Sequence, residues 1–388
     1  MRILYISSMF DSETYKRVFT KEKKPMHAAM KYHTLLSKGL AANGVPGNTY
    51  SSIPANRENC DKLYVSSPSH TEGNLKSQYI ATFNLPGVRQ IQLMVKSFFK
   101  ALFMPKDTVV FYDALVVSAS YGAIAGARLS GKKCVTVITD LPRYMPVSTD
   151  EKKLRINDKL VDMADGYVFL TSQMNDTVNV KGKPYVVLEG HVDSEMRSKE
   201  HLPFDTGCKR VLYAGTLNKI YGIKNLCESF AAISKSGEEL HIYGDGDYAS
   251  ELKELISSHT NIIYHGNCVN EVVVDAELDS ALLVNPRPTE GEYTKYSFPS
   301  KTLEYMVSGT PVLSAKLQGI PAEYDDYLYY FDDKAENGLA CALREILDKS
   351  SDELRLRGEK SRAFALEKKN NIIQAKHVLS LCEEITKK

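Results

Sequence analysis

The chain has 388 residues, of which 43% are hydrophobic and 25% charged, and its formal net charge is +1. This length exceeds one ordinary hydrophobic core and predicts two domains, while the balanced charge excludes a globally basic nucleic-acid-binding protein. Seven scattered cysteines without a C-x-x-C pair are typical of a reducing compartment. The first residues are apolar only from Ile3 to Ile6, too short for a signal peptide or anchor, so we expect a cytoplasmic protein.

Short β-branched or aromatic runs alternate with helical patterns, which predicts a parallel α/β fold. In the first half we expect strands at 2–7, 108–113, 133–139, 166–171 and 184–189. Helices are expected at 28–44 and 114–131, each ending on a glycine that can adopt the left-handed conformation.

Residues 193–208 are polar and lack an apolar period, so they are expected to connect two domains. The second series has predicted strands at 209–216, 239–246, 261–266, 280–286, 310–315 and 327–331, and helices at 222–235, 248–257 and 299–308. The sequence thus predicts two Rossmann-like domains, 1–192 and 209–370, with a ligand at the carboxyl ends of their strands. The C-terminal helix, 371–388, is expected to pack back on the first domain.

Residues 89–106 place several phenylalanines and aliphatic side chains on one helical face. Two interpretations remain open: a core or hinge helix, or a patch that touches a membrane or a lipid-linked acceptor. The basic segment 15–24 is predicted to be a solvated loop, or to supply positive charge beside that patch.

The segment YSFPSKTLEYMVSGTPV, residues 296–312, predicts a helix that opens on Pro299, Ser300 and Lys301 and carries Glu304 one turn later. A helix start at the carboxyl edge of a sheet offers unpaired N–H groups to a phosphate, and Lys301 adds a full charge. A carboxylate such as Glu304 suits a ribose diol instead. The pattern indicates a nucleotide diphosphate across the helix start, and the alternative is a capped surface helix.

The segment YAGTLNKIYGIKNL, 213–226, is a strand, a glycine turn and a helix. Gly215 permits close approach of a ligand to the backbone, and Thr216 and Lys219 supply a hydroxyl and a charge. A plain turn fits the same residues, so this pattern alone does not distinguish a ligand-binding loop from a turn.

The segment GDGDYA, 244–249, matches the spacing of two motifs, a dinucleotide-binding fingerprint and a D-x-D metal site, but neither function is expected. Asp245 and Asp247 would repel the pyrophosphate of a nicotinamide cofactor, and no acidic residue follows at the usual spacing. A D-x-D metal site belongs to sugar-transfer enzymes with a single nucleotide-binding domain, so no metal is expected. We place Gly244 among the donor-binding residues.

In the first half, Asp140 follows a strand and is a candidate catalytic group, or else a turn or helix-capping acid. His27 lies beside the loop after the first strand and is assigned to the acceptor side. His33 is expected to be a packed or surface histidine.

Taken together, the segments 213–226 and 296–313 in two Rossmann-like halves resemble the family 4 glycosyltransferases of GT-B fold, in which two such domains face across a cleft. The resemblance is strongest to bacterial members that build capsular and other surface polysaccharides. It implies retaining transfer of a sugar from a nucleotide-diphosphate donor, with no cofactor and no metal. The implied acceptor is a saccharide or a lipid-linked saccharide, with a weak peripheral contact at the inner face of the membrane.

The resemblance also implies roles for single residues. Lys301 corresponds to a ligand of the donor phosphate, and Glu304 to the glutamate that binds the ribose. Thr216 and Lys219 fall near the family's basic phosphate pair, although an arginine is common at the position of Thr216. Tyr296 occupies the position of the family's other glutamate.

Other classes of protein remain as alternatives. A GT-B nucleotide-sugar epimerase would need no acceptor, and a catalytically silent subunit would bind nucleotide without turnover. A nicotinamide enzyme and a pyridoxal-phosphate phosphorylase fit less well, because the former lacks its fingerprint and the latter needs a much longer chain.

Overall fold

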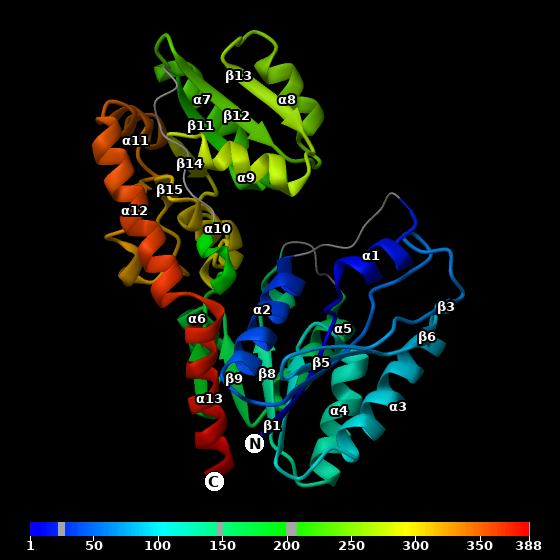
Figure 1. Ribbon diagram of the computed structural model, residues 1–388. Coiled ribbons are helices and arrows are strands. Elements are labelled where there is room, and N and C mark those ends of the chain that lie inside the picture. The colour runs from blue at the N-terminus through cyan, green and yellow to red at the C-terminus, as the bar shows by residue number, and fades with distance from the viewer. Residues whose placement is uncertain (22–27, 146–149, 199–207, 388) are drawn as a thin grey trace. The chain divides into compact units, whose positions relative to one another are not determined.

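The computed structural model describes residues 1–21, 28–145, 150–198 and 208–387. His27, and Lys23 and Lys24 of the basic segment, lie outside these residues. The chain forms two compact units (Figure 1), the first made of Met1–His191 with Asn370–Lys388 and the second of Val192–Lys369.

The first unit is built on an 8-stranded sheet in the order β10-β9-β8-β7-β1-β2-β5-β4. Its strands are parallel except for β4, which is antiparallel to β5. Its strands are β1 (Arg2–Ser7), β2 (Gly47–Ser51), β4 (His70–Glu72), β5 (Leu75–Tyr79), β7 (Thr108–Asp113), β8 (Cys134–Ile138), β9 (Gly166–Phe169) and β10 (Tyr185–Val187), and a separate pair is β3 (Tyr64–Val65) and β6 (Thr82–Phe83).

Helices cover this sheet, and the central strands are therefore buried runs, as parallel sheets require. The helical elements of the first unit are α1 (Ser12–Val18), α2 (Ala28–Ala42), α3 (Val88–Leu102), α4 (Val117–Leu129), η1 (Pro142–Tyr144), α5 (Glu151–Asp162), α6 (Ser172–Val178) and α13 (Asn371–Lys387). The predicted α/β class is confirmed, and α2 and α4 are followed by Gly44 and Gly131 in the left-handed conformation.

Two expectations for the first half were wrong in detail. The strands β2 and β5 were not predicted, although they extend the sheet beyond β1. The basic segment 15–24 is not simply a loop, because its first residues belong to α1, which Asp11 caps by accepting a hydrogen bond from Thr14 N.

The last helix, α13, belongs to the first unit although it ends the chain. Its buried residues Ala375, Val378 and Leu381 share one core cluster with Ile3 of β1 and Leu36 of α2. A Cβ atom at Gly39 would clash with the carbonyl oxygen of Asn371, so α2 admits the start of α13 only because that position lacks a side chain.

The second unit is built on a 6-stranded parallel sheet in the order β13-β12-β11-β14-β15-β16. Its elements are η2 (Ser194–Ser198), β11 (Lys209–Ala214), η3 (Lys219–Tyr221), α7 (Ile223–Ile233), β12 (Glu238–Tyr243), α8 (Ala249–Ile256), β13 (Ile262–Gly266), α9 (Asn270–Leu278), β14 (Leu282–Asn285), η4 (Glu292–Tyr296), α10 (Ser300–Ser308), β15 (Val312–Ala315), η5 (Ala322–Tyr324), β16 (Tyr329–Phe331), α11 (Gly338–Leu347) and α12 (Ser351–Lys368). The chain runs outward from β11 to β13 and then returns to β14, so the strand order reverses between β11 and β14. Ligands of open α/β sheets bind outside the carboxyl ends of the strands at such a point.

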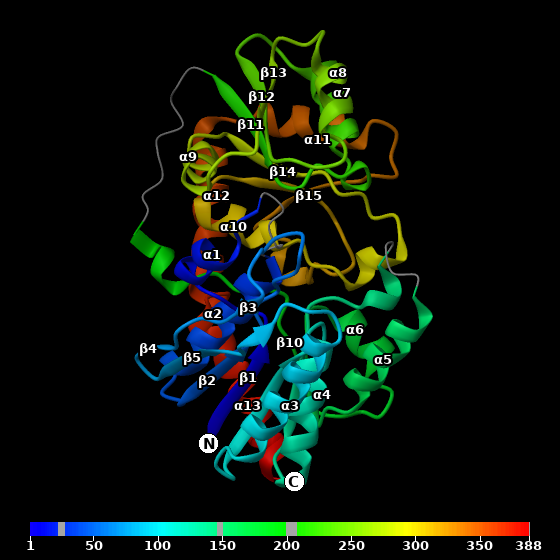
Figure 2. The same cartoon turned by 90° about the vertical axis from the view of Figure 1, so that its right-hand side faces the viewer.

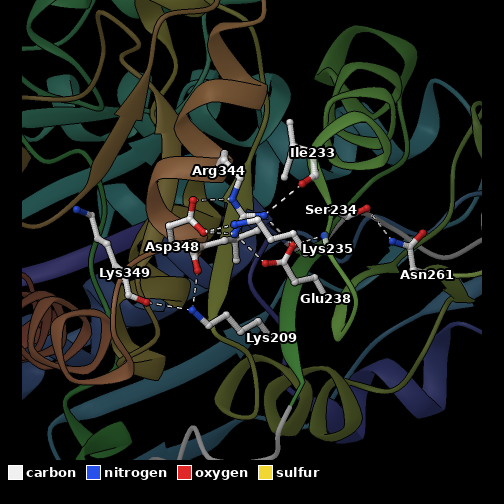
Figure 3. Close-up of polar contacts among 10 residues, drawn as sticks. Lys209, Ile233, Ser234, Lys235, Glu238, Asn261, Arg344, Asp348 and Lys349 are labelled. Atoms are coloured by element: carbon white, nitrogen blue, oxygen red, sulfur yellow. Dashed lines mark hydrogen bonds and ion pairs between the residues drawn. The ribbon is translucent and has the colours of Figure 1, made fainter.

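A polar network fastens α11 to the amino-terminal edge of this sheet (Figure 3). Arg344 donates two hydrogen bonds to the carboxylate of Glu238 and further ones to Asp348. Lys209 donates to the carbonyl oxygens of Leu347 and Lys349. The network lies at the amino-terminal ends of β11 and β12, opposite the loops that follow these strands, so it supports the sheet without reaching those loops.

Candidate active site

The loops that follow β11 and β14 meet at the carboxyl edge of the second sheet. Gly222 has a φ of +77°, and a Cβ atom there would come within 2.2 Å of the carbonyl oxygen of Pro286. The loop after β14 is held in turn by Asp333, which accepts hydrogen bonds from the backbone and hydroxyl of Thr289. The two loops at the strand-order reversal therefore pack closely against each other through their backbones.

Helix α10 begins at this edge. Pro299 is its N-cap and provides no side-chain hydrogen bond, so the helix starts at Ser300 rather than at Pro299 as predicted. Ser300 is exposed, and Lys301 and Glu304 are partly exposed, while the rest of the helix is buried. The first turn thus presents a hydroxyl, an ammonium and backbone N–H groups at the sheet edge, with a carboxylate one turn behind.

Tyr305 fixes the position of this helix. Its buried hydroxyl accepts a hydrogen bond from Ala214 N at 2.8 Å and donates one to Ala214 O at 3.0 Å. The register between β11 and β14 ends at Leu212, so these two backbone groups lie beyond the paired part of the strands. The Tyr305 hydroxyl therefore satisfies two backbone groups that β14 does not pair, and it joins α10 to the end of β11.

The predicted neighbours Gly215 and Lys301 are brought together. A Cβ atom at Gly215 would lie 2.9 Å from Cε of Lys301 and 2.8 Å from the hydroxyl of Tyr213. The Tyr213 hydroxyl donates to the carbonyl oxygen of Thr216 and so braces the turn. The absence of a side chain at Gly215 therefore leaves room for the stem of Lys301.

The glycines of the segment 244–249 serve contacts within the protein. Gly244 has a φ of +133°, and a Cβ atom there would come within 1.8 Å of the carbonyl oxygen of Gly215. A Cβ atom at Gly246 would come within 2.3 Å of the carbonyl oxygen of Leu217, and Leu217 N donates to Asp245 O at 3.0 Å. The glycine spacing that resembles a dinucleotide fingerprint is thus explained by backbone packing between two neighbouring loops.

Thr216 and Lys219 are both exposed in the loop after β11. The Nζ atom of Lys219 lies 2.5 Å from a carboxylate oxygen of Glu251 on α8, and this hydrogen bond raises the pKa of Lys219. Its charge is directed toward α8 in this structure, so contact with a ligand would require the ion pair to open.

Arg287 was missed by the sequence analysis. Its guanidinium lies 4.2 Å from the centre of the Tyr221 ring and donates a hydrogen bond to the hydroxyl of Ser297. Its charge opposes the rise in pKa that burial causes in Tyr213. A second fixed cation therefore lies among the loops after β11 and β14. The only signal in the sequence was its position directly after a buried strand.

The remaining candidates of the second unit lie near this edge. Tyr296 ends η4 and is partly exposed, and Glu290 and Glu292 are exposed in the same loop. Thr294 is buried and donates to the carbonyl oxygen of Thr289, which fixes the turn that carries them.

In the first unit, Asp140 follows β8 and is partly exposed. His33 is a packed histidine: it is fully buried, with Nδ1 2.7 Å from the hydroxyl of Tyr5 and Nε2 3.1 Å from a carboxylate oxygen of Asp113. His33 therefore tethers α2 to β1 and β7.

Residues 208–349 match the model of a family described as glycosyl transferases, group 1. No curated protein sequence matches the chain. Among solved structures, sucrose-phosphate synthase from Thermosynechococcus elongatus has a TM-score of 0.70 at 16% identity, covering 100% of this chain and 99% of that one. The lipopolysaccharide outer core galactosyltransferase WaaB has a TM-score of 0.66 at 14% identity, covering 99% of both chains. HepE from Anabaena, determined in complex with UDP, has a TM-score of 0.66 at 13% identity, covering 99% of this chain and 100% of that one.

The fold is the two-domain GT-B fold, and the family match covers the unit that carries α10 and the Gly215 loop. Within this fold, residues 208–349 resemble the group 1 glycosyl transferases.

Proposed function

We propose that the protein is a retaining glycosyltransferase that moves a sugar from a nucleotide-diphosphate sugar to a saccharide or lipid-linked saccharide in polysaccharide biosynthesis. The observation that carries the proposal is the position of Lys301, at a helix start beside Gly215 and at the strand-order reversal of the second sheet. A diphosphate placed there would meet a full positive charge and the free N–H groups of α10.

In this proposal the second unit holds the donor. The N–H groups of the first turn, the Ser300 hydroxyl and the Lys301 ammonium stabilise the negative charge that develops on the diphosphate as the glycosidic bond breaks. Glu304, one turn deeper, accepts hydrogen bonds from the ribose hydroxyls. Arg287 supplies a further positive charge at the edge of the same loops.

The reaction balances without a protein base. The bond between the anomeric carbon and the phosphate oxygen breaks, and a bond from the anomeric carbon to the acceptor oxygen forms on the same face. The acceptor proton passes to the departing phosphate oxygen. Asp140 of the first unit is the proposed acceptor-side catalytic group, and neither a metal nor an organic cofactor is required.

The solved relatives suggest which donors to test first. HepE is described in complex with UDP, and a trehalose-6-phosphate protein from E. coli is described bound with UDP-2-fluoro glucose. WaaB is described as a lipopolysaccharide galactosyltransferase, which supports a surface-saccharide acceptor for this chain. We propose a cytoplasmic location with a weak peripheral membrane contact.

A ligand screen followed by a turnover assay tests the function. UDP, GDP, ADP and their sugar conjugates are compared by thermal shift, where a ligand at a hundred times its Kd adds about 2.7 kcal/mol of stability. We expect one nucleotide to stabilise wild type and to lose this effect in Lys301→Ala. Transfer of labelled sugar only when an acceptor is present supports the transferase. Release of free nucleotide without acceptor indicates the epimerase, and stabilisation without turnover toward any saccharide or lipid-linked acceptor indicates the silent subunit.

A further inference from the structure

Helix α3 presents apolar side chains to solvent along its whole length. Ile91 is 60% exposed, Phe99 49% and Phe103, just past the end of the helix, 78%. These positions are spaced by eight and four residues and therefore share one helical face. The rings of Phe99 and Phe103 stack with their centres 6.0 Å apart. The exposed face is thus a continuous ridge.

The core-helix interpretation of residues 89–106 accounts only for the opposite face. The buried side chains of α3 are Leu93, Ser97 and Ala101. Phe98 is only partly exposed, whereas Phe103 is the most exposed phenylalanine of this segment.

The outward orientation is fixed by close packing of α3 on α4, which lie side by side in both views (Figures 1 and 2). A Cβ atom at Gly122 would come within 1.9 Å of the carbonyl oxygen of Met94, and one at Gly126 within 2.2 Å of that of Phe98. Lys96 also donates to the carbonyl oxygen of Ala81. Because the backbones interlock, α3 cannot turn its phenylalanines inward.

The ridge continues onto the strand pair β3 and β6. Phe83 N donates to the side-chain oxygen of Gln92 on α3, and the exposed rings of Phe83 and Tyr64 lie 5.3 Å apart. We call this surface, made of Tyr64, Phe83, Ile91, Val95, Phe99 and Phe103, the α3 ridge.

The two stretches of sequence that form α3, α4 and most of the α3 ridge are basic. No aspartate or glutamate occurs between Glu72 and Asp107, or between Asp113 and Asp140. The basic residues in these two stretches are Lys76, Arg89, Lys96, Lys100, Lys106, Arg128, Lys132 and Lys133. The formal charge of the two stretches is therefore +8, whereas the whole chain carries only +1.

Two pairs of these lysines are close enough to interact. Burial lowers the pKa of Lys132 and the charge of Lys106 lowers it further, and Lys76 acts in the same way on Lys100. Lys132 is buried and donates to the carbonyl oxygen of Leu102, so Lys106 is the exposed charge of its pair. An anionic partner would reduce the repulsion within both pairs.

We propose that the α3 ridge docks on an anionic lipid bilayer surface, with Phe99 and Phe103 entering the boundary between headgroups and acyl chains. An amphipathic helix with lysines beside its apolar face is the usual form of such a contact. Pairing with a second copy through the same ridge is disfavoured, because it would bring the basic residues of two copies together.

The basic segment 15–24 contributes less than the sequence suggested. Lys21 pairs with Asp61, and Arg17 donates to the carbonyl oxygen of Ser66. The charge that favours anionic lipid comes from α3, α4 and the segments beside them. None of the described helices is long and apolar enough to cross a membrane, so the contact lies in the plane of the interface.

Co-sedimentation of the full chain with vesicles tests the proposal. Vesicles of phosphatidylcholine with phosphatidylglycerol are compared with phosphatidylcholine alone, at low and high salt. We expect binding to the anionic vesicles that weakens with salt, and a loss of roughly tenfold or more in Phe99→Ser/Phe103→Ser. Lys106→Glu should also weaken binding. The matched control is Val180→Ser/Leu356→Ser, which removes two exposed apolar side chains elsewhere and should bind like wild type.

Equal binding of wild type and the phenylalanine variant, or no binding at low salt, overturns the proposal. So does a lipid-free dimer that the phenylalanine variant abolishes, because the ridge would then be a protein interface. The thermal midpoint should be retained, since both rings are exposed. Nucleotide-induced thermal shifts should be unchanged in these variants, so failure here is distinct from failure of the donor-site proposal.

Discussion

The stem of Lys301 lies against the backbone of Gly215, so close that a Cβ atom at Gly215 would be 2.9 Å from Lys301 Cε. Helix α10 and the turn after β11 therefore constrain each other at the centre of the candidate donor site. Gly215→Ala should displace Lys301 and weaken nucleotide binding by about tenfold. A double-mutant cycle with Lys301→Ala, measured by calorimetric titration, should show a combined loss well below the sum of the single losses. Strict additivity would mean that the two residues act separately.

Lys301→Ala and Glu304→Gln should each reduce turnover sharply without unfolding the protein. For Lys301 we expect a loss of about a hundredfold or more in kcat, because the charge it stabilises develops as the donor bond breaks. For Glu304 the larger change is expected in donor KM. Lys253→Ala, an exposed lysine on α8, is the control and should retain wild-type kinetics. Near-normal rates in both variants would contradict the assignment of Lys301 and Glu304 to a donor-binding site.

Tyr305→Phe should destabilise the second unit by about 1–3 kcal/mol, because it leaves the N–H and carbonyl groups of Ala214 without their partner. The measurement is the urea dependence of unfolding. Tyr121→Phe removes a single hydrogen bond near the surface of the first unit and serves as control, with a smaller expected loss. If Tyr305→Phe left the free energy of unfolding unchanged, another group would have to satisfy the N–H and carbonyl of Ala214.

Transfer activity should persist in excess EDTA. Within the described part of the chain no three His, Cys, Asp or Glu side chains converge in a way that could hold a metal ion, and this includes Asp245 and Asp247. Sugar transfer is measured before and after chelation, and again after adding Mn²⁺ or Mg²⁺. Loss of activity that either ion restores would contradict the proposed metal-independent mechanism.

His191 should make the first unit sensitive to acid. Burial lowers its pKa to about 4, and Nε2 lies 2.7 Å from the carbonyl oxygen of Tyr32, which suits a neutral ring that donates from Nε2. In the unfolded chain this histidine binds a proton near pH 6.5. The contribution of the neutral His191 to the free energy of unfolding is therefore fully present above that pH. It is lost as the pH falls toward 4, at a cost of up to about 3 kcal/mol. His191→Gln should flatten this dependence in thermal melts, whereas His377→Gln, an exposed histidine, should not.

Much of the fold follows from the sequence because buried parallel strands are continuous apolar runs. The ranges of β1 and β7 were predicted to the residue. In contrast, β2 begins on Gly47 and alternates buried with partly exposed residues, so it lacks that run. Its place in the sheet depends on pairing with β1, which local pattern does not reveal.

The sequence singles out the start of α10 as part of a candidate site but gives no sign of Arg287. Pro299, Ser300 and Lys301 stand out because a polar cluster opens an otherwise apolar helix. Arg287 lies in a loop with no periodicity, and its relation to Tyr221 arises only when the loops after β11 and β14 come together. The ion pair of Lys219 with Glu251 likewise joins two loops that no local pattern connects.

Because α13 completes the core of the first unit, that core cannot close until residues 371–387 have been synthesised. The second unit, whose residues are all translated earlier, can close while the first is still open. Nascent chains would then hold a finished second unit together with a first unit whose apolar cluster around Ile3 and Leu36 remains uncovered. Loss of residues 371–387 would leave the protein in that state, so α13 governs how safely the first unit matures.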